Sequence, residues 1–180
     1  MTLSALMIAL LAIFAQFSIP IGPVAVTLQT FVVFLIGALM TPKNAFLTTV
    51  LYLVLGLLGA PVFANFNGGL HSFLLPSFGF ALSWVPATTL QALYLKRIEE
   101  VTTKQLVFSF IINFLMTYLI GLAYMAMIIN VNTGNLMNIA EILWIGFLPF
   151  IPGDIMKIFV ATLLVKRLRN YFKRFTENTF

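Results

Sequence analysis

The first 95 residues carry one formally charged side chain, Lys43. A segment of this length with so little charge is typical of a protein whose surface contacts lipid rather than water. Charged residues make up 8% of the chain and hydrophobic residues 61%, whereas about 25% of the residues of a soluble domain are charged. A bilayer accommodates so much apolar surface, so we expect an integral membrane protein. The 180 residues are expected to form one membrane domain, 1–180, without a separate soluble domain.

Interruptions of the apolar sequence predict six transmembrane helices in an all-α fold. The Pro-Ile-Gly-Pro sequence at 20–23 separates the first two spans, and a segment rich in Gly, Pro and Asn at 59–76 separates the third from the fourth. The predicted spans are 3–18, 24–40, 45–58, 78–95, 106–129 and 142–165, followed by a basic tail at 166–180. Several spans fall short of the ~20 residues of a straight crossing, so either the loops enter the membrane or the helices are longer.

Basic residues occur in alternate connections, and this pattern predicts the orientation of the chain. They are Lys43 before the third span, Lys96, Arg97 and Lys104 between the fourth and fifth, and Lys166, Arg167, Arg169, Lys173 and Arg174 after the sixth. The positive-inside rule places both termini in the cytoplasm and the remaining three loops outside. No basic residue precedes the first apolar run, so a retained helix is favoured over a signal peptide.

Asp154 and Lys157 are the charged residues within the last predicted span. Each charge near the centre of a membrane helix costs ~2.5–3.5 kcal/mol on insertion scales, so it normally faces a partner or a polar cavity. Pro149, Pro152 and Gly153 precede the pair and interrupt a regular helix. A charged pair beside a broken helix predicts a binding site, and a structural ion pair is the alternative.

The outer segment between the third and fourth spans has groups suited to a ligand. Asn65 and Asn67 offer amide donors and acceptors, and Phe66 and Phe78 offer apolar ring faces. This set suits a small, mostly apolar ligand with urea-like or amide-like groups, although Asn and Gly also form plain turns. Gln29, within the second span, either bonds between helices or reaches the ligand.

Several chemistries are disfavoured by the residues present. The chain has no cysteine, which excludes disulfides, thiolate metal sites and cysteine nucleophiles. His71 is the single histidine, so no metal site is expected. No phosphate-binding loop is present, and the net charge of +5 is explained by orientation signals rather than by a nucleic-acid partner.

The order of motifs resembles one transporter family, the biotin-specific substrate-binding subunits of energy-coupling factor transporters (the BioY family). The run Ile-Pro-Ile-Gly-Pro-Val-Ala-Val-Thr-Leu-Gln-Thr-Phe at 19–31 is similar to its first-loop and second-helix signature. The other matching motifs are Leu-Tyr-Leu-Val-Leu-Gly at 51–56, Gly-Ala-Pro-Val-Phe at 59–63, Asn-Gly-Gly at 67–69 and Phe-Leu-Pro-Phe-Ile-Pro-Gly-Asp-Ile-Met-Lys at 147–157. The resemblance extends over residues 5–170.

The resemblance implies a six-helix S component that binds biotin with high affinity in an outward-facing pocket, has no cofactor and is not an enzyme. Asp154 is expected to accept hydrogen bonds from the ureido N–H groups of biotin. Asn67, or alternatively Asn65, is expected to donate to the ureido oxygen, and Lys157 either neutralises Asp154 or reaches the ligand. The expected aromatic walls are Phe66, Phe78, Tyr52 and Trp84.

The same resemblance implies that energy comes from other proteins, a transmembrane coupling subunit (T component) and two ATP-binding cassette ATPases. Ala5 and Ala9 fit the Ala-x-x-x-Ala pattern with which this group docks the coupling subunit. A multi-pass protein of the bacterial plasma membrane is the expected setting. The alternatives are an S component for another vitamin, an intramembrane enzyme using Asp154 with His71, or an assembly subunit without a ligand.

Overall fold

The structure is a computed structural model that describes the backbone of residues 2–177 and the side chains of 2–169, those at 20 and 21 excepted. Lys173, Arg174 and the end of the predicted basic tail therefore lie outside the described side chains. The elements are α1 (Thr2–Gln16), β1 (Ser18–Ile21), β2 (Val24–Thr27), α2 (Gln29–Leu39), α3 (Pro42–Leu57), η1 (Ala64–Phe66), η2 (Leu70–Leu74), α4 (Phe78–Lys96), α5 (Thr103–Thr133), α6 (Ile139–Gly146) and α7 (Ile151–Glu177).

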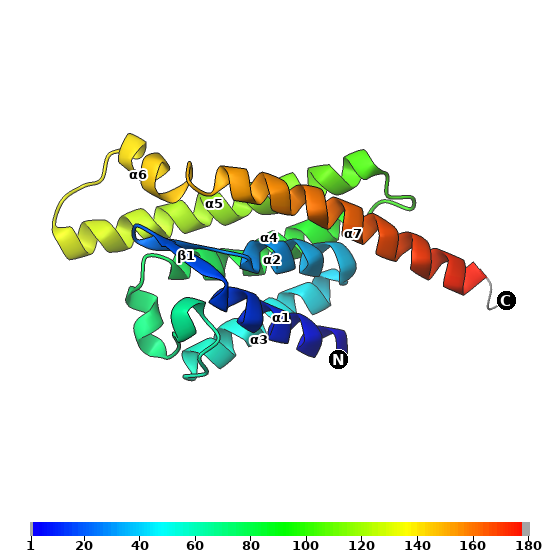
Figure 1. The fold of residues 1–180 in the computed structure, drawn as a ribbon, viewed down its shortest axis with the longest axis horizontal. Helices are drawn as coiled ribbons and strands as arrows, with labels where there is room; N and C mark the ends of the chain where they lie inside the picture. The colour runs from blue at the N-terminus through cyan, green and yellow to red at the C-terminus, as the bar shows by residue number, and fades with distance from the viewer. Residues whose placement is uncertain (1, 178–180) are drawn as a thin grey trace.

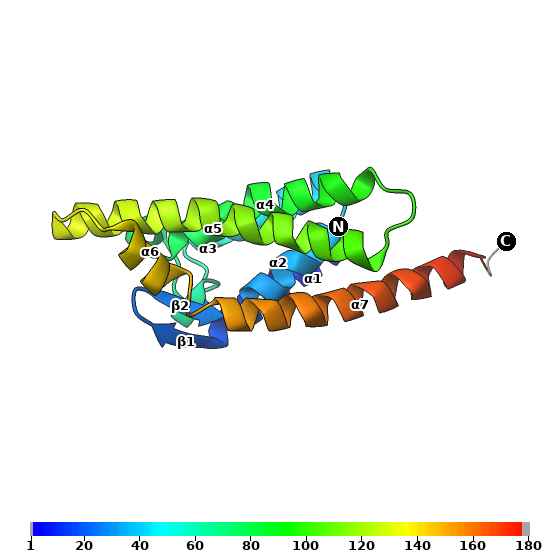
Figure 2. The ribbon, with the colours of Figure 1, turned by 90° about the horizontal axis from the view of Figure 1, so that it is seen from above.

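The helices run lengthwise through the molecule and leave two different ends (Figure 1). The start of α1, the end of α7 and the connection from α4 to α5 lie at one end, which we call the terminal end. The β-hairpin, η1, η2 and the connection from α5 to α6 lie at the other, the hairpin end. Seen from above, α7 follows one side and α4 and α5 the other, with α2 packed between α4 and α7 (Figure 2).

Helix ends follow from local capping chemistry. The Thr102 side chain accepts from the Gln105 N–H, and Gln105 bonds back to the Thr102 backbone, so α5 begins with a capping box. Asn138 and Glu141 make the same arrangement at α6. Gly134, with φ of 71°, ends α5 in the left-handed conformation that glycine adopts without a steric penalty.

The first predicted loop is a β-hairpin, so the prediction that the second helix starts at 24 is wrong. Ser18 pairs with Thr27 and Ile21 with Val24 in antiparallel register, and α2 begins only at Gln29. Gly22 takes a φ of 68° at the turn. The β-branched residues of β2, whose sequence is Val-Ala-Val-Thr, favour the strand, while α1 ends at Gln16 rather than at the predicted 18.

The last predicted span is not continuous. The helix α6 ends at Gly146, and α7 starts at Ile151 with its axis bent by 52° from that of α6. The expected interruption is confirmed, but it falls at 147–150, ahead of Pro152. Pro152 lies in the first turn of α7. A backbone N–H there has no hydrogen-bond partner within the helix, so a proline can take the position without losing a hydrogen bond.

A helical fold is thus confirmed, and the helix lengths vary widely. Within residues 2–177, α5 alone is long and apolar enough to cross a membrane unaided, and α6 with α7 forms a second, bent candidate. The apolar helices α1, α2 and α3 have 15, 11 and 16 residues, fewer than the ~20 of a straight crossing.

A buried polar column joins α2, α4 and α5 in the bundle. The Asn113 amide donates to Gln91 Oε1 at 2.6 Å, and the Gln91 amide donates to the Phe34 carbonyl at 3.2 Å. Ser109 and Thr117 complete the column at either side of Asn113. Each polar group has a partner, so the column stabilises the packing of these helices rather than weakening it.

Gly37 makes this column sensitive to a single methyl group. A Cβ on Gly37 would lie 2.2 Å from Gln91 Oε1, so we expect Gly37→Ala to destabilise the folded chain by about 1–3 kcal/mol. Gly153→Ala is the matched control, because a Cβ there meets no atom within 4 Å and alanine favours the helix. Thermal unfolding in detergent measures both, and equal midpoints would contradict the predicted clash.

Candidate binding site

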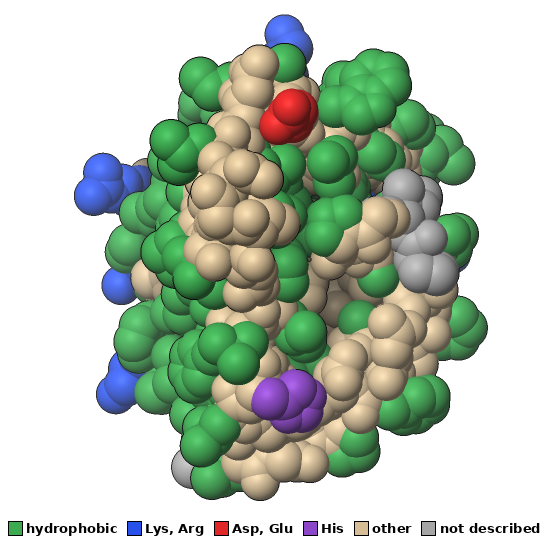
Figure 3. All heavy atoms as spheres, turned by 90° about the vertical axis from the view of Figure 1, so that its left-hand side faces the viewer, with side chains coloured by type: hydrophobic (Ala, Val, Ile, Leu, Met, Phe, Trp, Pro, Cys, Tyr) green, Lys and Arg blue, Asp and Glu red, His purple; other side chains and the backbone are tan. Residues whose placement is uncertain are grey.

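A cavity of about 240 Å³ opens at the hairpin end, between the β-hairpin, the η1–η2 segment, α2, α4, α5 and α7. Figure 3 shows hydrophobic side chains, together with backbone and uncharged polar groups, around a hollow on this face. The histidine lies below the hollow, one acidic side chain lies near the top of the face, and Lys and Arg lie at the outer edge of the molecule. The lining residues are Gly22, Pro23, Val24, Ala25, Thr27, Gln29, Thr30, Phe63, Ala64, Asn65, Asn67, Ser72, Leu75, Ser77, Phe78, Phe80, Ala81, Trp84, Thr117, Tyr118, Phe150, Asp154 and Lys157. The volume lies just below the range of about 300–1,000 Å³ of typical small-molecule pockets, so any ligand enclosed here is small.

Asp154 provides the buried carboxylate of this cavity. It lies in the first turn of α7, where the helix dipole favours a negative charge, and is 1% exposed. The Tyr118 hydroxyl donates to Asp154 Oδ2 at 2.6 Å, and the Thr30 hydroxyl donates to Oδ1 at 3.1 Å. Lys157 Nζ donates to Oδ1 at 2.8 Å. A carboxylate has about four acceptor sites, so it keeps capacity for one further donor.

Lys157 has its donors committed within the protein. Its ammonium donates to Asp154 Oδ1, to the Thr27 carbonyl at 2.7 Å and to Thr30 Oγ1 at 2.8 Å. A lysine ammonium has three N–H donors, so none remains for a ligand. Of the two roles expected for Lys157, this geometry favours neutralisation of Asp154. The bonds also tie the end of β2 and the start of α2 to α7.

Gln29 lines the cavity, but its amide is used between helices. Gln29 Nε2 donates to the Tyr52 hydroxyl at 2.7 Å and to the Leu11 carbonyl at 3.4 Å, and the Tyr52 hydroxyl donates onward to the Val62 carbonyl at 2.7 Å. Tyr52 is fully buried and does not line the cavity, contrary to its predicted place in the wall. It packs behind Trp84, with ring centroids 6.0 Å apart.

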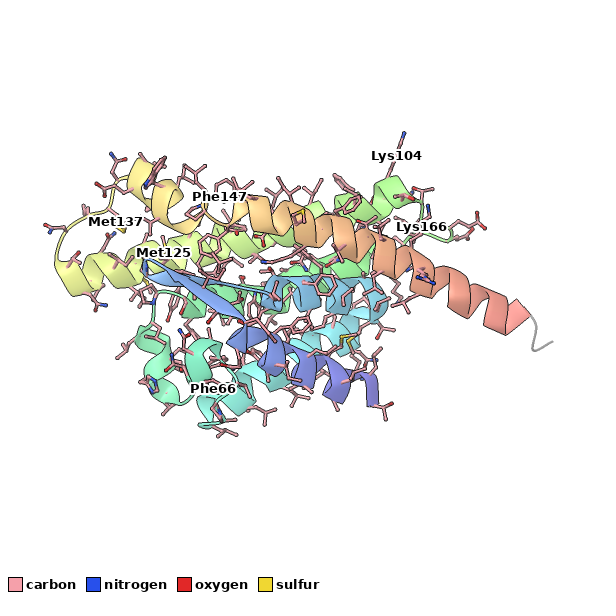
Figure 4. All side chains as sticks on the ribbon, viewed as in Figure 1. Phe66, Lys104, Met125, Met137, Phe147 and Lys166 are labelled. Carbon is pink, nitrogen blue, oxygen red and sulfur yellow. The ribbon has the colours of Figure 1, made fainter. Side chains whose placement is uncertain are left out.

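The segment between α3 and α4 and the start of α4 hold the four outer side chains predicted to meet the ligand, and three of these line the cavity. Asn65 and Asn67 both line it; Asn65 Oδ1 accepts from the Ser18 hydroxyl, and the Asn67 amide donates to the Ala64 carbonyl. Phe66 does not line it: its side chain is 71% exposed and points outward at the edge of the hairpin end (Figure 4). Phe78, only 4% exposed, does form part of the wall.

Sequence reasoning missed several lining residues, among them Tyr118, Thr30 and Ser72. Thr30 lies within the motif at 19–31 and was therefore open to detection, whereas the contact of Tyr118 with Asp154 spans 36 residues and carries no local signal. No cluster of three or more His, Cys, Asp or Glu residues occurs among the described residues. His71 is exposed and does not line the cavity.

Ala5 and Ala9 lie on a different surface. Both are exposed on α1, on the outside of the bundle, and neither lines the cavity. Leu6 and Ile13, each 54% exposed, extend the same apolar surface of the helix.

The fold is a bundle of apolar helices with a cavity, lined by a buried charged pair, at one end. The chain belongs to the BioY family, whose sequence model matches residues 1–174. A relative from Pyrococcus horikoshii named probable biotin transporter BioY is 36% identical over 168 residues, 93% of this chain and 94% of the relative. The biotin transporter BioY of Lactococcus lactis subsp. cremoris is 34% identical over 94% of this chain and 89% of the relative.

The fold has a close counterpart among solved structures. The crystal structure of an S-component for biotin from an ECF-type ABC transporter superposes with a TM-score of 0.83 at 28% sequence identity. The match covers 94% of this chain and 89% of that chain. This family is one of transporter components, so the chain is not an enzyme, and no cofactor belongs to it.

The buried pair gives a testable coupling. Lys157→Met leaves Asp154 buried without its cation, and we expect a loss of about 3–5 kcal/mol in folding stability. Asp154→Leu with Lys157→Met removes both charges and should be more stable than Lys157→Met alone. Thermal unfolding in detergent of the two single variants and the double variant measures this coupling, and purely additive losses would contradict it.

Proposed function

We propose that this protein is the biotin-binding S component of an energy-coupling factor transporter, with high affinity for biotin. It captures biotin from outside and delivers it inward when coupled to a separate ATPase module. The observation that carries the proposal is the buried Asp154 carboxylate at the cavity wall, with its cation already held by protein groups. The names of the relatives and of the solved S component support biotin as the ligand.

Asp154 recognises the ureido head of biotin by accepting an N–H donor on its remaining acceptor site. Such a charge-assisted hydrogen bond is short and strong in a site that excludes water. Phe78, Phe150 and Trp84 provide apolar wall for the sulfur-containing ring and the alkyl chain. Of the two proposed amide donors, Asn67 is the more buried, because Asn67 is partly buried and Asn65 is exposed.

We assign six membrane crossings with both termini in the cytoplasm and the cavity on the outer side. Lys104 and Lys166 lie at the terminal end, as Figure 4 shows, and no Lys or Arg occurs in the three connections at the hairpin end. The positive-inside rule then supports a cytoplasmic terminal end. The short helices and irregular η1–η2 backbone are compatible with the bilayer where they line a cavity.

The partners that we propose for transport are a T component and two ATP-binding cassette ATPases, as the ECF type of the solved S component implies. The chain has no phosphate-binding loop of its own. The exposed Ala5 and Ala9 surface of α1 is the proposed docking site for the T component. Small side chains there let a second helix approach closely.

The binding proposal is tested with detergent-purified protein and labelled biotin. We expect saturable binding near one biotin per chain, weakened by about tenfold or more in Asp154→Asn, because the amide loses the charge-assisted acceptor. Glu99→Gln is the matched control, since Glu99 is an exposed carboxylate outside the cavity.

A folded wild-type chain that binds no biotin would refute the ligand assignment, and a vitamin panel would then identify another substrate. Turnover of a ligand that depends on Asp154 would favour the enzyme alternative instead. His71 does not line the cavity, and this counts against that alternative.

Docking is tested separately from binding. Ala9→Trp places a large side chain on the exposed face of α1, so we expect biotin uptake by cells with the complete transporter to fall by about tenfold or more while binding by the isolated chain is unchanged. Ala140→Trp, at an exposed position of α6, is the control. Equal uptake by both variants would show that this face does not dock the T component.

A further inference from the structure

Two buried polar atoms in the cavity wall have no partner. Among the described buried side chains, Ser72 Oγ and Trp84 Nε1 are the N or O atoms without a hydrogen bond. Ser72 is 1% exposed and Trp84 is 5% exposed, and both line the cavity, from η2 and α4. Buried polar groups are nearly always paired, so two unpaired donors beside one cavity point to a bound group that completes them.

The Trp84 ring and the backbone of Ser72 are held in place by their surroundings. The Trp84 ring packs against the Tyr52 ring, and Tyr52 is fixed in turn by its bonds to Gln29 and Val62. The backbone of Ser72 donates to the Gly69 carbonyl at 3.1 Å and accepts from the Leu75 N–H at 3.1 Å. The unpaired atoms therefore sit on a preformed wall, and binding needs no reordering of that wall.

The chemistry of these atoms selects an acceptor. An indole N–H only donates, and a hydroxyl can donate in any rotamer its surroundings permit. Asp154 and Lys157 are the charged residues of the lining, and the donors of Lys157 are already committed. A ligand carboxylate here would be buried without a cation, which is costly, whereas a neutral carbonyl oxygen carries no such penalty.

Resting on the proposed function, we propose that Trp84 Nε1 and Ser72 Oγ bind the ureido carbonyl oxygen of biotin. The cavity then offers an acceptor to the urea N–H group, from Asp154, and donors to its oxygen, from α4 and η2. This replaces Asn67 and Asn65 as the principal donors to that oxygen. The ligand carboxylate points to the mouth of the cavity, where Gly22, Pro23 and Asn65 are exposed.

The test compares biotin with biotin methyl ester, which keeps the urea and removes the carboxylate charge. Trp84→Phe keeps an aromatic side chain but deletes the N–H together with the five-membered ring, and Ser72→Ala deletes the hydroxyl. We expect each variant to weaken the binding of both ligands by about tenfold, with wild-type affinities for the two ligands within about threefold. Ser83→Ala is the matched control, because Ser83 is buried beside Trp84, bonds to the Phe80 carbonyl and does not line the cavity.

A second readout follows the indole directly. The chain has two tryptophans, and Trp144 is exposed on α6 outside the cavity, so Trp144→Phe leaves Trp84 as the single tryptophan, which can be excited selectively over the tyrosines. Biotin should then change the fluorescence emission of Trp84. When Ser72→Ala is added, the same change should need a higher biotin concentration.

The outcomes separate this inference from the proposed function. Wild-type binding of biotin with no effect of Trp84→Phe and Ser72→Ala would overturn the second anchor and leave the biotin assignment intact. A loss for biotin but not for its ester would assign the donors to the carboxylate, and would also overturn the inference. A folded wild-type chain that binds no biotin would overturn both claims.

Discussion

The burial of one charged pair, Asp154 with Lys157, inside an apolar bundle determines how the surrounding elements are joined. An isolated charge in an apolar interior is strongly unfavourable, so Asp154 and Lys157 need every available partner. Thr27, Thr30 and Tyr118 supply those partners from the β-hairpin, α2 and α5. Satisfying the pair thus joins four parts of the fold and places a carboxylate at the wall of the cavity.

Irregular backbone surrounds that carboxylate for a physical reason. A regular helix covers its own polar groups, whereas a hairpin, two 3-10 turns and a break before α7 leave room for an enclosed space at one end of the bundle. Such backbone is stable at membrane depth only when it lines a cavity or is buried in protein. Next to the cavity, the Gln91–Asn113 column joins the helices by buried hydrogen bonds. The irregular backbone around the cavity is therefore attached to a well-packed part of the bundle.

The sequence predicted the parts of the site that carry a local signal. The charged pair, the interruption before it and the start of the fourth helix at Phe78 were all readable from residue type and spacing. Phe66 and Tyr52 were expected in the wall from their ring chemistry and the family resemblance, but Phe66 faces outward and Tyr52 packs one layer behind. Composition identifies a residue that can bind, and only packing decides which way it faces.

The sequence by itself determined the class of protein, because the free energy of placing a segment in a bilayer depends mainly on which residues it contains. It also located the charged pair, since a charge within an apolar run is costly wherever the run folds. The tertiary structure alone decided which polar atoms are used and which are free. Lys157 meets Thr27 across 130 residues of chain, while Trp84 Nε1 meets no partner. Hydrogen-bond satisfaction depends on three-dimensional proximity, which no local sequence pattern encodes.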